Sequence, residues 1–303
     1  MFIKIKNFLQ PNEAINVMQK NEYVLTISCP DKIGIVSNVA TFLYNNKCNI
    51  IESAQFGDSD NGMFFMRVSF ENISNKKLNI LSLEKNFAQI KDKYKMKSTF
   101  FDMSKKEKVI IMVSKFGHCL NNILFQWKSK MLNIDIPVII SNHNDLSDMV
   151  KPYKIPFIYI PISNQNKLKQ ENKLLKLVKQ KEIDLIILAR YMQILSPKTS
   201  NKLKGKVINI HHSFLPSFKG ARPYKQAYVK GVKIIGATSH YVTDQLDEGQ
   251  IIEQDIARVN HSNSLDNFVS IGRDIENSVL LRSLIWHIEH RILVNGKRTI
   301  VFH

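Results

Sequence analysis

The chain has 303 residues, of which 44% are hydrophobic and 23% charged, a composition typical of folded globular proteins and unlike that of long disordered chains. Its length predicts two domains, and no stretch reaches the ~20 apolar residues of a membrane helix. The net charge of +17 comes from lysines scattered along the chain, so we expect a basic surface that attracts anionic small molecules, and no nucleic-acid partner.

The first part of the chain changes its hydrophobic period in the order of a βαββαβ domain. Strands are expected at residues 23–28, in a pair that includes 64–70, and just before residue 103, with helices at 34–45 and 81–94. Asn61 and Gly62 are typical of a hairpin turn between the paired strands. A calcium loop starting at Asp58 is the alternative, but its glycine is one place early and Ser69 stands where a closing Glu is needed.

The segment of residues 29–36, between the first strand and the first helix, resembles that of ACT domains, a ferredoxin-like regulatory fold that often binds amino acids between two copies. The resemblance implies a regulatory domain at residues 20–104, with an effector site at Asp31, Gly34, Ile35 and Asn49. It also implies a homo-oligomer, a dimer or a tetramer. Two alternatives stay open: Asp31 caps the helix, or the domain serves only for pairing.

Apolar strands alternate with helical stretches after the charged segment 104–108. They are expected at residues 109–113, 136–141, 157–160, 183–188 and 207–210. Such near-continuous apolar strands predict an α/β domain at residues 105–303 whose mainly parallel sheet is covered on both faces. Further along, a strand is expected at 236–242, a helix at 265–292 and a short hairpin at 295–296.

Ligands of parallel sheets bind at the carboxyl ends of the strands, where polar residues gather in this chain. Asn209 and His211 end one strand, and Asp247 lies in the turn after the strand that holds His240, so we expect the first three to converge. An Asn amide and a protonated His can stabilise a developing oxyanion, while Asp can orient a water molecule or accept its proton. These residues predict transfer or hydrolysis of an acyl group without a protein nucleophile.

Each of these residues also has an ordinary structural explanation, because Asn and His at strand ends satisfy backbone groups and Asp before Gly makes turns. Zinc held by His211, His212 and His240 is a further alternative. Adjacent histidines point in different directions along a strand, however, and no cysteine completes a ligand set. We therefore expect no metal.

Five short motifs follow one another between residues 209 and 249: Asn-x-His, Ser-Phe-Leu-Pro, Gly-Ala-Arg-Pro-Tyr, Gly-Ala-Thr-Ser-His-Tyr-Val-Thr and Leu-Asp-Glu-Gly. In this order they resemble the folate-dependent formyltransferase family, whose fold is Rossmann-like. The resemblance implies that Asn209, His211 and Asp247 are catalytic and that the formyl group is carried on N10 of tetrahydrofolate. The residues implied in folate binding are Arg190, Tyr191, Met192, Ile194, Leu195 and His240.

Within that family the chain is most similar to formyltetrahydrofolate deformylases, which join an ACT-like domain to the formyltransferase-like one. Transferases that act on glycinamide ribonucleotide carry a glycine-rich loop after their first strand to hold the phosphate, whereas residues 114–119 contain one glycine. The expected acceptor is therefore water. One departure is Gln250, which stands where the deformylase pattern usually has a rigid proline.

The expected function is hydrolysis of 10-formyltetrahydrofolate to tetrahydrofolate and formate, which supplies formate for purine synthesis and balances one-carbon pools. The folate is the substrate, and no cofactor is expected. The alternatives are formyl transfer to an amine acceptor and a catalytically silent amino-acid sensor. Three cysteines without C-x-x-C spacing indicate a reducing compartment, so we expect a cytoplasmic protein.

Overall fold

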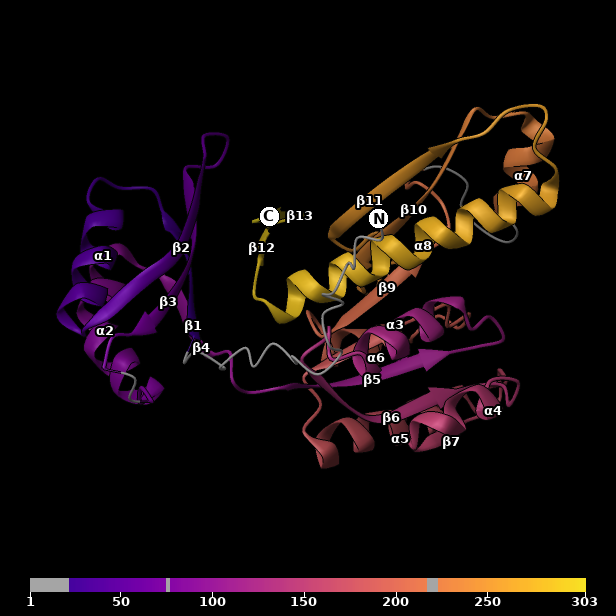
Figure 1. The fold of residues 1–303 in the computed structure, drawn as a ribbon, viewed down its shortest axis with the longest axis horizontal. Helices are drawn as coiled ribbons and strands as arrows, with labels where there is room; N and C mark the ends of the chain where they lie inside the picture. Colours follow the sequence, from indigo (N-terminus) through magenta and orange to yellow (C-terminus); the bar gives the residue numbers. More distant parts are fainter. Residues whose placement is uncertain (1–21, 75–76, 217–222) are drawn as a thin grey trace, which may run out of the picture. The chain divides into compact units, whose positions relative to one another are not determined.

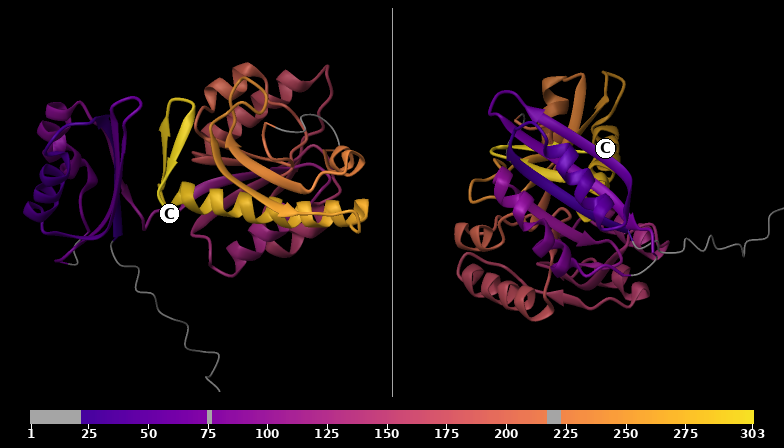
Figure 2. Two further views of the ribbon diagram at one scale, coloured as in Figure 1. Left: turned by 90° about the horizontal axis from the view of Figure 1, so that it is seen from above. Right: turned by 90° about the vertical axis from the view of Figure 1, so that its left-hand side faces the viewer.

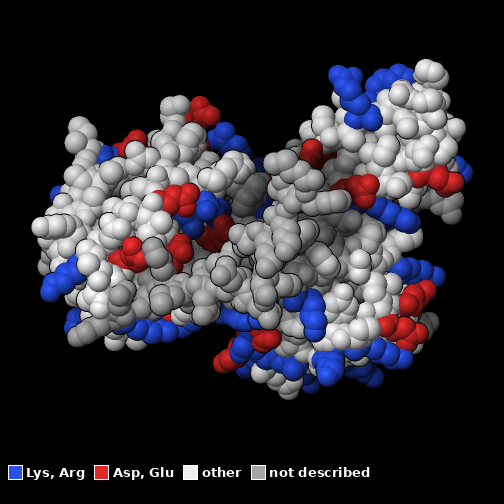
Figure 3. Space-filling model, in the orientation of Figure 1, with Lys and Arg blue, Asp and Glu red and all other residues white. Residues whose placement is uncertain are grey.

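The chain divides into two compact units, residues 1–104 (unit 1) and 105–303 (unit 2), shown in the computed structural model of Figure 1. The structure describes residues 22–74, 77–216 and 223–303. Within these ranges, none of the helices is long and apolar enough to span a membrane. On the face drawn in Figure 3, Lys and Arg side chains are interspersed with Asp and Glu side chains.

Unit 1 has the predicted βαββαβ order. Its elements are β1 (Glu22–Pro30), α1 (Ile35–Asn45), β2 (Cys48–Asp58), β3 (Met63–Asn72), α2 (Ile80–Tyr94) and β4 (Lys97–Asp102). The four strands form one antiparallel sheet in the order β2-β3-β1-β4, with both helices on one face (Figure 2). This arrangement is consistent with an ACT-like domain.

The hairpin turn between β2 and β3 is the one that Asn61 and Gly62 predict. Gly62 has a φ of +66°, and its N–H donates to the Asp58 carbonyl at 2.8 Å. The side chains of Asp58 and Asn61 accept hydrogen bonds from the backbone N–H groups of Asp60 and Met63. The segment therefore has the polar contacts of a turn, and these use the oxygens that the calcium alternative would need.

Unit 2 is an α/β domain built on one seven-stranded sheet. Its strands are β5 (Glu107–Val113), β6 (Ile134–Ser141), β7 (Phe157–Tyr159), β8 (Leu185–Leu188), β9 (Val207–His211), β10 (Ile234–Tyr241) and β11 (Ile251–Arg258). The order is β11-β10-β9-β8-β5-β6-β7, and the five strands from β9 to β7 are parallel. The prediction of a mainly parallel sheet is confirmed.

Helices cover both faces of this sheet, as near-continuous apolar strands require. The helices are α3 (His118–Lys128), α4 (Ser147–Val150), α5 (Lys167–Lys181), α6 (Pro197–Lys202), α7 (Pro223–Lys230) and α8 (Leu265–Ile288), with a 3₁₀ turn at Lys151–Tyr153. Along β5, Val109 and Ile111 pack with residues of α3, α7 and α8, whereas Ile110 and Met112 pack with Leu174 of α5. The strand is therefore buried on both sides.

Two sequence predictions for unit 2 were incomplete. The antiparallel edge strand β11 was not predicted, because exposed and half-buried polar residues dominate it. The last helix ends at Ile288 and not at residue 292, because His290 adopts a left-handed φ of +52° that no helix can continue through. The chain then forms the hairpin of β12 (Ile292–Asn295) and β13 (Arg298–Val301), whose predicted turn at residues 295–296 is confirmed.

Candidate active site

A cleft of about 300 Å³ opens at the carboxyl ends of β8 and β9. Its walls are the loop after β8, the end of β9 and the loop after β10, which brings Asp247 back beside β9. Ligands of open α/β sheets bind at this edge. Of the predicted residues, those that line the cleft are Asn209, His211, Asp247, His240, Arg190, Tyr191, Met192, Ile194 and Leu195.

Asn209 and His240 are paired across β9 and β10, and their side chains meet. Asn209 Nδ2 lies 3.2 Å from His240 Nε2, and His240 Nδ1 lies 2.9 Å from the carbonyl oxygen of Tyr241. A carbonyl can only accept, so Nδ1 carries a proton, and Nε2 faces the Asn209 amide. His240, assigned to substrate binding from the sequence, thus contacts and orients the Asn209 amide.

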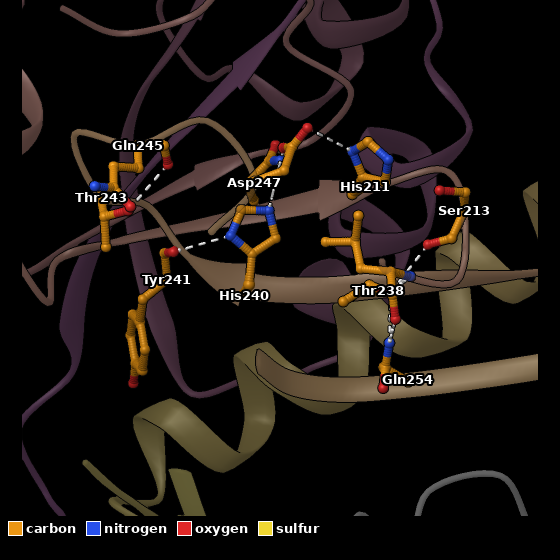
Figure 4. Close-up of polar contacts among 11 residues, drawn as sticks. His211, Ser213, Thr238, His240, Tyr241, Thr243, Gln245, Asp247 and Gln254 are labelled. Atoms are coloured by element: carbon orange, nitrogen blue, oxygen red, sulfur yellow. Dashed lines mark hydrogen bonds and ion pairs between the residues drawn. The ribbon is translucent and has the colours of Figure 1, made fainter. Parts of the chain in front are cut away.

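Asp247 lies between two histidines (Figure 4). Its Oδ2 is 3.3 Å from His211 Nδ1, and its Oδ1 is 3.6 Å from His240 Nε2. Burial raises the pKa of this carboxyl group, but the hydrogen bonds from His211 and His240 outweigh burial and hold the pKa well below its ordinary range. Asp247 is therefore a carboxylate at neutral pH.

The backbone around Asp247 is tightly constrained. Asp247 itself has a left-handed φ of +55°, which is uncommon for a residue with a side chain. Two residues later, a Cβ at Gly249 would lie 1.6 Å from the carbonyl oxygen of Tyr241, so only glycine fits there. Backbone in a sparsely populated conformation at a polar cleft is typical of functional sites.

His211 has one ring nitrogen available for a ligand. Its Nδ1 faces Asp247, whereas its Nε2 is buried and has no hydrogen-bond partner among the residues that the structure describes. The neighbouring His212 differs: burial, and next the charge of Arg190, lower its pKa to about 3. His212 is thus neutral, and it lines the same cleft although the sequence gave it a place only in the zinc alternative.

Residues 190–195, which the sequence predicts to bind folate, form one wall of the cleft. Tyr191 and Leu195 are buried and anchor the segment, while Met192 and Ile194 are about half-exposed. Gln193, which lies within this predicted segment, also lines the cleft. So do residues 242–246, which follow β10 directly; the position of that segment after a strand was the signal that could have found it.

The loop after β5 has a different role from a phosphate cradle. Ser114 is buried and donates to Asn142 Oδ1 at 2.6 Å, while it accepts from the backbone N–H of Met192 at 2.9 Å. A Cβ on Gly117 would approach Met149 to 2.8 Å. The single glycine of this loop thus permits close packing, and Ser114 holds segment 190–195 through Met192.

A zinc site needs several ligand atoms close together, and among the described residues His211, His212 and His240 do not form such a group. Among the described residues, His118, Cys119 and Glu276 are the set whose potential ligand atoms lie within 4.8 Å of one another. Glu276 already contacts the Arg190 guanidinium at 3.3 Å and the Tyr224 hydroxyl at 2.5 Å. Burial raises the pKa of the Cys119 thiol well above its usual value, so it is not a thiolate. These groups are poorly suited to a metal.

The predicted effector residues do not converge within one chain. Asp31 and Gly34 lie between β1 and α1, where Ile35 is buried in the core at 2% exposure. Asn49 is the second residue of β2, whereas Asp31 approaches Gly57 near the far end of that strand, about 25 Å away at ~3.3 Å per residue. Gly34 caps α1 without a side-chain hydrogen bond, so the alternative that Asp31 caps this helix is wrong.

Comparison with known proteins matches this chain to enzymes of folate metabolism. The formyl transferase family matches residues 107–284, which include the whole cleft. Formyltetrahydrofolate deformylase of Bacillus subtilis is 46% identical over 282 residues, 92% of this chain and 93% of that protein. That of Synechocystis is 44% identical over 94% of this chain and 100% of its own length.

The chain belongs to the formyltetrahydrofolate deformylase family. A crystal structure of a deformylase from Pseudomonas syringae superposes with a TM-score of 0.91 at 41% identity, covering 95% of this chain and 97% of the other. An alignment of 282 residues is longer than unit 2, so the deformylase similarity extends over most of unit 1 as well. The fold and the family resemblance predicted from the sequence are confirmed.

Proposed function

We propose that this protein hydrolyses 10-formyltetrahydrofolate to tetrahydrofolate and formate. The observation that carries the proposal is the grouping of Asn209, His211 and Asp247 around one cleft, with an unpartnered nitrogen of His211 among the described residues. Deformylase relatives that are 40–46% identical over 92% of the chain or more support the same chemistry.

In the proposed reaction, water adds to the formyl carbon and the carbonyl oxygen becomes an oxyanion. The Asn209 amide and the His211 Nε2–H donate hydrogen bonds to that oxygen, and charge stabilisation of this kind commonly gives about 10²–10³ in rate per donor. The C–N10 bond then breaks as N10 receives the proton that the attacking water loses. The products are formate and tetrahydrofolate, with no covalent enzyme intermediate.

The low pKa of Asp247 refines its proposed role. A carboxylate with a depressed pKa is a weak base, so strong proton abstraction is not what it does best. Its carboxylate, 3.3 Å from His211 Nδ1, instead orients the His211 ring so that Nε2 faces the oxyanion. It also accepts a hydrogen bond from the attacking water and so orients it.

The test is formate release from 10-formyltetrahydrofolate by the purified protein. We expect turnover by the wild type without an added acceptor, and a loss of about a hundredfold or more in Asp247→Asn, which keeps the shape but removes the charge. A second arm adds glycinamide ribonucleotide. Formyl loss that requires this amine would replace hydrolysis by transfer, and an unaffected rate in Asp247→Asn would contradict the role given to Asp247.

We also propose that the enzyme works in the cytoplasm as a homo-oligomer that supplies formate for purine synthesis, with an amino-acid effector at unit 1. Three free, buried cysteines support a reducing compartment. The separation of Asn49 from Asp31 supports an effector site completed by a second copy. Formate release measured with single amino acids added, beside sedimentation of the same samples, tests both: one amino acid should change the rate, and the protein should not sediment as a monomer.

A further inference from the structure

Two buried carboxylates stand at the two ends of segment 190–195. Glu276 of α8 is 0% exposed and Glu171 of α5 is 4% exposed. Carboxylates are rarely buried so completely, because removing their charge from water destabilises the fold unless partners compensate. The two helices cover opposite faces of the sheet, yet both side chains hold the same loop.

Glu276 holds the first residue of the segment. Its Oε2 lies 3.3 Å from Arg190 Nε and 2.8 Å from His118 Nε2, while its Oε1 accepts from the Tyr224 hydroxyl at 2.5 Å. Burial raises the pKa of Glu276, but the hydrogen bond from His118 and the charge of Arg190 outweigh it and lower the pKa. An ionised Glu276 thus faces a guanidinium that is itself 9% exposed.

The backbone at Arg190 needs such a hold. Its φ of +65° is left-handed, a strained conformation that L-residues with side chains rarely adopt. The ion pair with Glu276 keeps the Arg190 side chain under α8 and so holds the backbone in this turn. The direction in which the chain leaves β8 is set at this residue.

Glu171 holds the other end of the segment. Its carboxylate accepts hydrogen bonds from the backbone N–H of Ser196 at 2.8 Å, from the Ser196 hydroxyl, and from the Thr199 hydroxyl at 2.7 Å. Ser196 directly follows Leu195 and caps α6. The carboxylate therefore fixes the point at which the segment ends and the helix begins.

The middle of the segment depends on these ends. It has no helix or strand, and Met192 and Ile194, 50% and 56% exposed, offer apolar surface to the cleft. The backbone N–H of Met192 has one hydrogen bond, to Ser114. A shift at either end would move this apolar surface, and misplacement by about 1 Å can reduce activity on the order of a hundredfold.

We propose that Glu276 and Glu171 are positioning residues that set the affinity of the cleft for folates by fixing the two ends of segment 190–195. Stability alone does not require the Glu276–Arg190 pair, because well-packed apolar residues replace buried ion pairs at little or no loss of stability. The choice of a folate as ligand rests on the function proposed above. In that function, segment 190–195 contacts the folate in both the ground state and the transition state. Loss of either carboxylate therefore weakens binding in both states and raises KM more than it lowers kcat.

The experiment compares Glu276→Gln and Glu171→Gln with the wild type in two assays. In the formate-release assay, each variant should show a KM raised about tenfold or more with kcat within about threefold. In titrations with tetrahydrofolate, which has no formyl group, Kd should rise by the same factor. If the wild type released no formate but the variants still bound tetrahydrofolate more weakly, the proposed function would be wrong. The positioning role of Glu276 and Glu171 would still be supported.

Tyr224→Phe is the matched control, because it removes a contact of Glu276 Oε1 and leaves the Arg190 contact at Oε2. We expect a lower Tm with unchanged KM. The double variant Arg190→Met/Glu276→Met removes both charges. Its KM should be no higher than that of Arg190→Met alone. This comparison tests the proposal even if Glu276→Gln does not fold. Unchanged KM and Kd in the Gln variants, or a purely additive double variant, would overturn the proposal.

Discussion

The core of unit 1 is built around aromatic rings, whereas unit 2 carries titratable side chains buried at the ends of its strands. Phe42, Phe70, Phe87 and Phe100 contact one another at centroid distances of 4.9–6.2 Å. All nine histidines of the chain lie in unit 2. Ring packing stabilises a fold and demands no chemistry, whereas buried His, Arg and Glu each need a partner.

We therefore expect the aromatic core of unit 1 to affect mainly stability and the buried polar residues of unit 2 to affect mainly activity. In unit 1, a substitution in the aromatic core should act on the free energy of unfolding and reach activity only through it. In unit 2, substitutions a few residues apart should differ by orders of magnitude in activity, because a few side chains contact the reacting group. We test this contrast between the two units with four predictions, ordered from the largest expected effect to the smallest.

Phe87→Ala should have the largest effect, and it acts on stability. Phe87 is fully buried and contacts the rings of Phe42 and Phe100, so truncation should lower the free energy of unfolding of unit 1 by about 3–5 kcal/mol. Chemical denaturation monitored by hydrogen exchange of β1 and β3 measures it. Phe125→Ala, at a side chain 60% exposed in α3, is the control and should cost under about 0.5 kcal/mol.

At a temperature where Phe87→Ala is folded, its kcat should stay within about twofold of the wild type, because its core contacts are with unit 1 residues. A kcat lowered tenfold in the folded variant would contradict the separation of stability from chemistry. It would show that the packing of unit 1 acts directly on the cleft.

Asn209→Ala should have nearly as large an effect on activity and little on stability. Loss of one oxyanion donor should lower kcat by about 10²–10³ with a small change in KM, because the bond forms mainly in the transition state. Steady-state formate release measures both constants. Asn201→Ala, at an exposed position of α6, should keep the wild-type rate. A variant of Asn209 that raises KM alone would make it a binding residue.

Much of this contrast can be predicted from the sequence, for local reasons. Apolar runs bounded by turn residues predict strands β5 to β9, and residues at strand ends predict the cleft with Asn209, His211 and Asp247. The pairing of partners is not local. Arg190 and Glu276 are far apart in the chain, and nothing in the hydrophobic period of α8 indicates that Glu276 is fully buried.

Edge strands of the sheet and the exact ends of helices are also hard to predict from the sequence. β11 pairs on one side only, so its residues need not be apolar and resemble those of a loop. The end of α8 depends on a left-handed His290, a residue with no strong preference for ending helices. The motif residues at Gly220 lie outside the described residues, so their part in the site stays a prediction.

Acid should destabilise unit 2 through its buried histidines. Burial lowers the pKa of His287 to about 4, below its ordinary value of 6.5. Because the folded-state pKa is depressed, the contribution of His287 is present above pH 6.5 and is lost as pH falls toward 4. At about 1.4 kcal/mol per pH unit, the loss is roughly 3 kcal/mol at pH 4.

The measurement is the free energy of unfolding of the wild type minus that of His287→Gln between pH 7 and pH 4. The comparison with a variant is needed because burial raises the pKa of Glu107 to about 7, and this contributes a pH dependence of opposite sign. The difference should fall as pH falls, and protection of unit 1 amides should not follow it. A difference that is flat with pH would show that His287 titrates normally in the folded protein.

Gln250→Pro should have the smallest effect. It tests the contrast between the two units next to a proposed catalytic residue, because Gln250 is three residues from Asp247. The Gln250 side chain donates to the Gly296 carbonyl at 3.1 Å in an exposed hydrogen bond, which contributes about 0.5–1 kcal/mol at most. Proline would remove that bond but restrict the unfolded chain, a gain of similar size. The backbone carbonyl of Gln250, which accepts from Tyr241 N–H at 3.0 Å, remains in proline.

For Gln250→Pro we therefore expect a change in Tm of a few degrees at most and formate release within about twofold of the wild type. A tenfold loss would mean that the side chain of Gln250, through the β12–β13 hairpin, helps to hold the Asp247 loop in its left-handed turn.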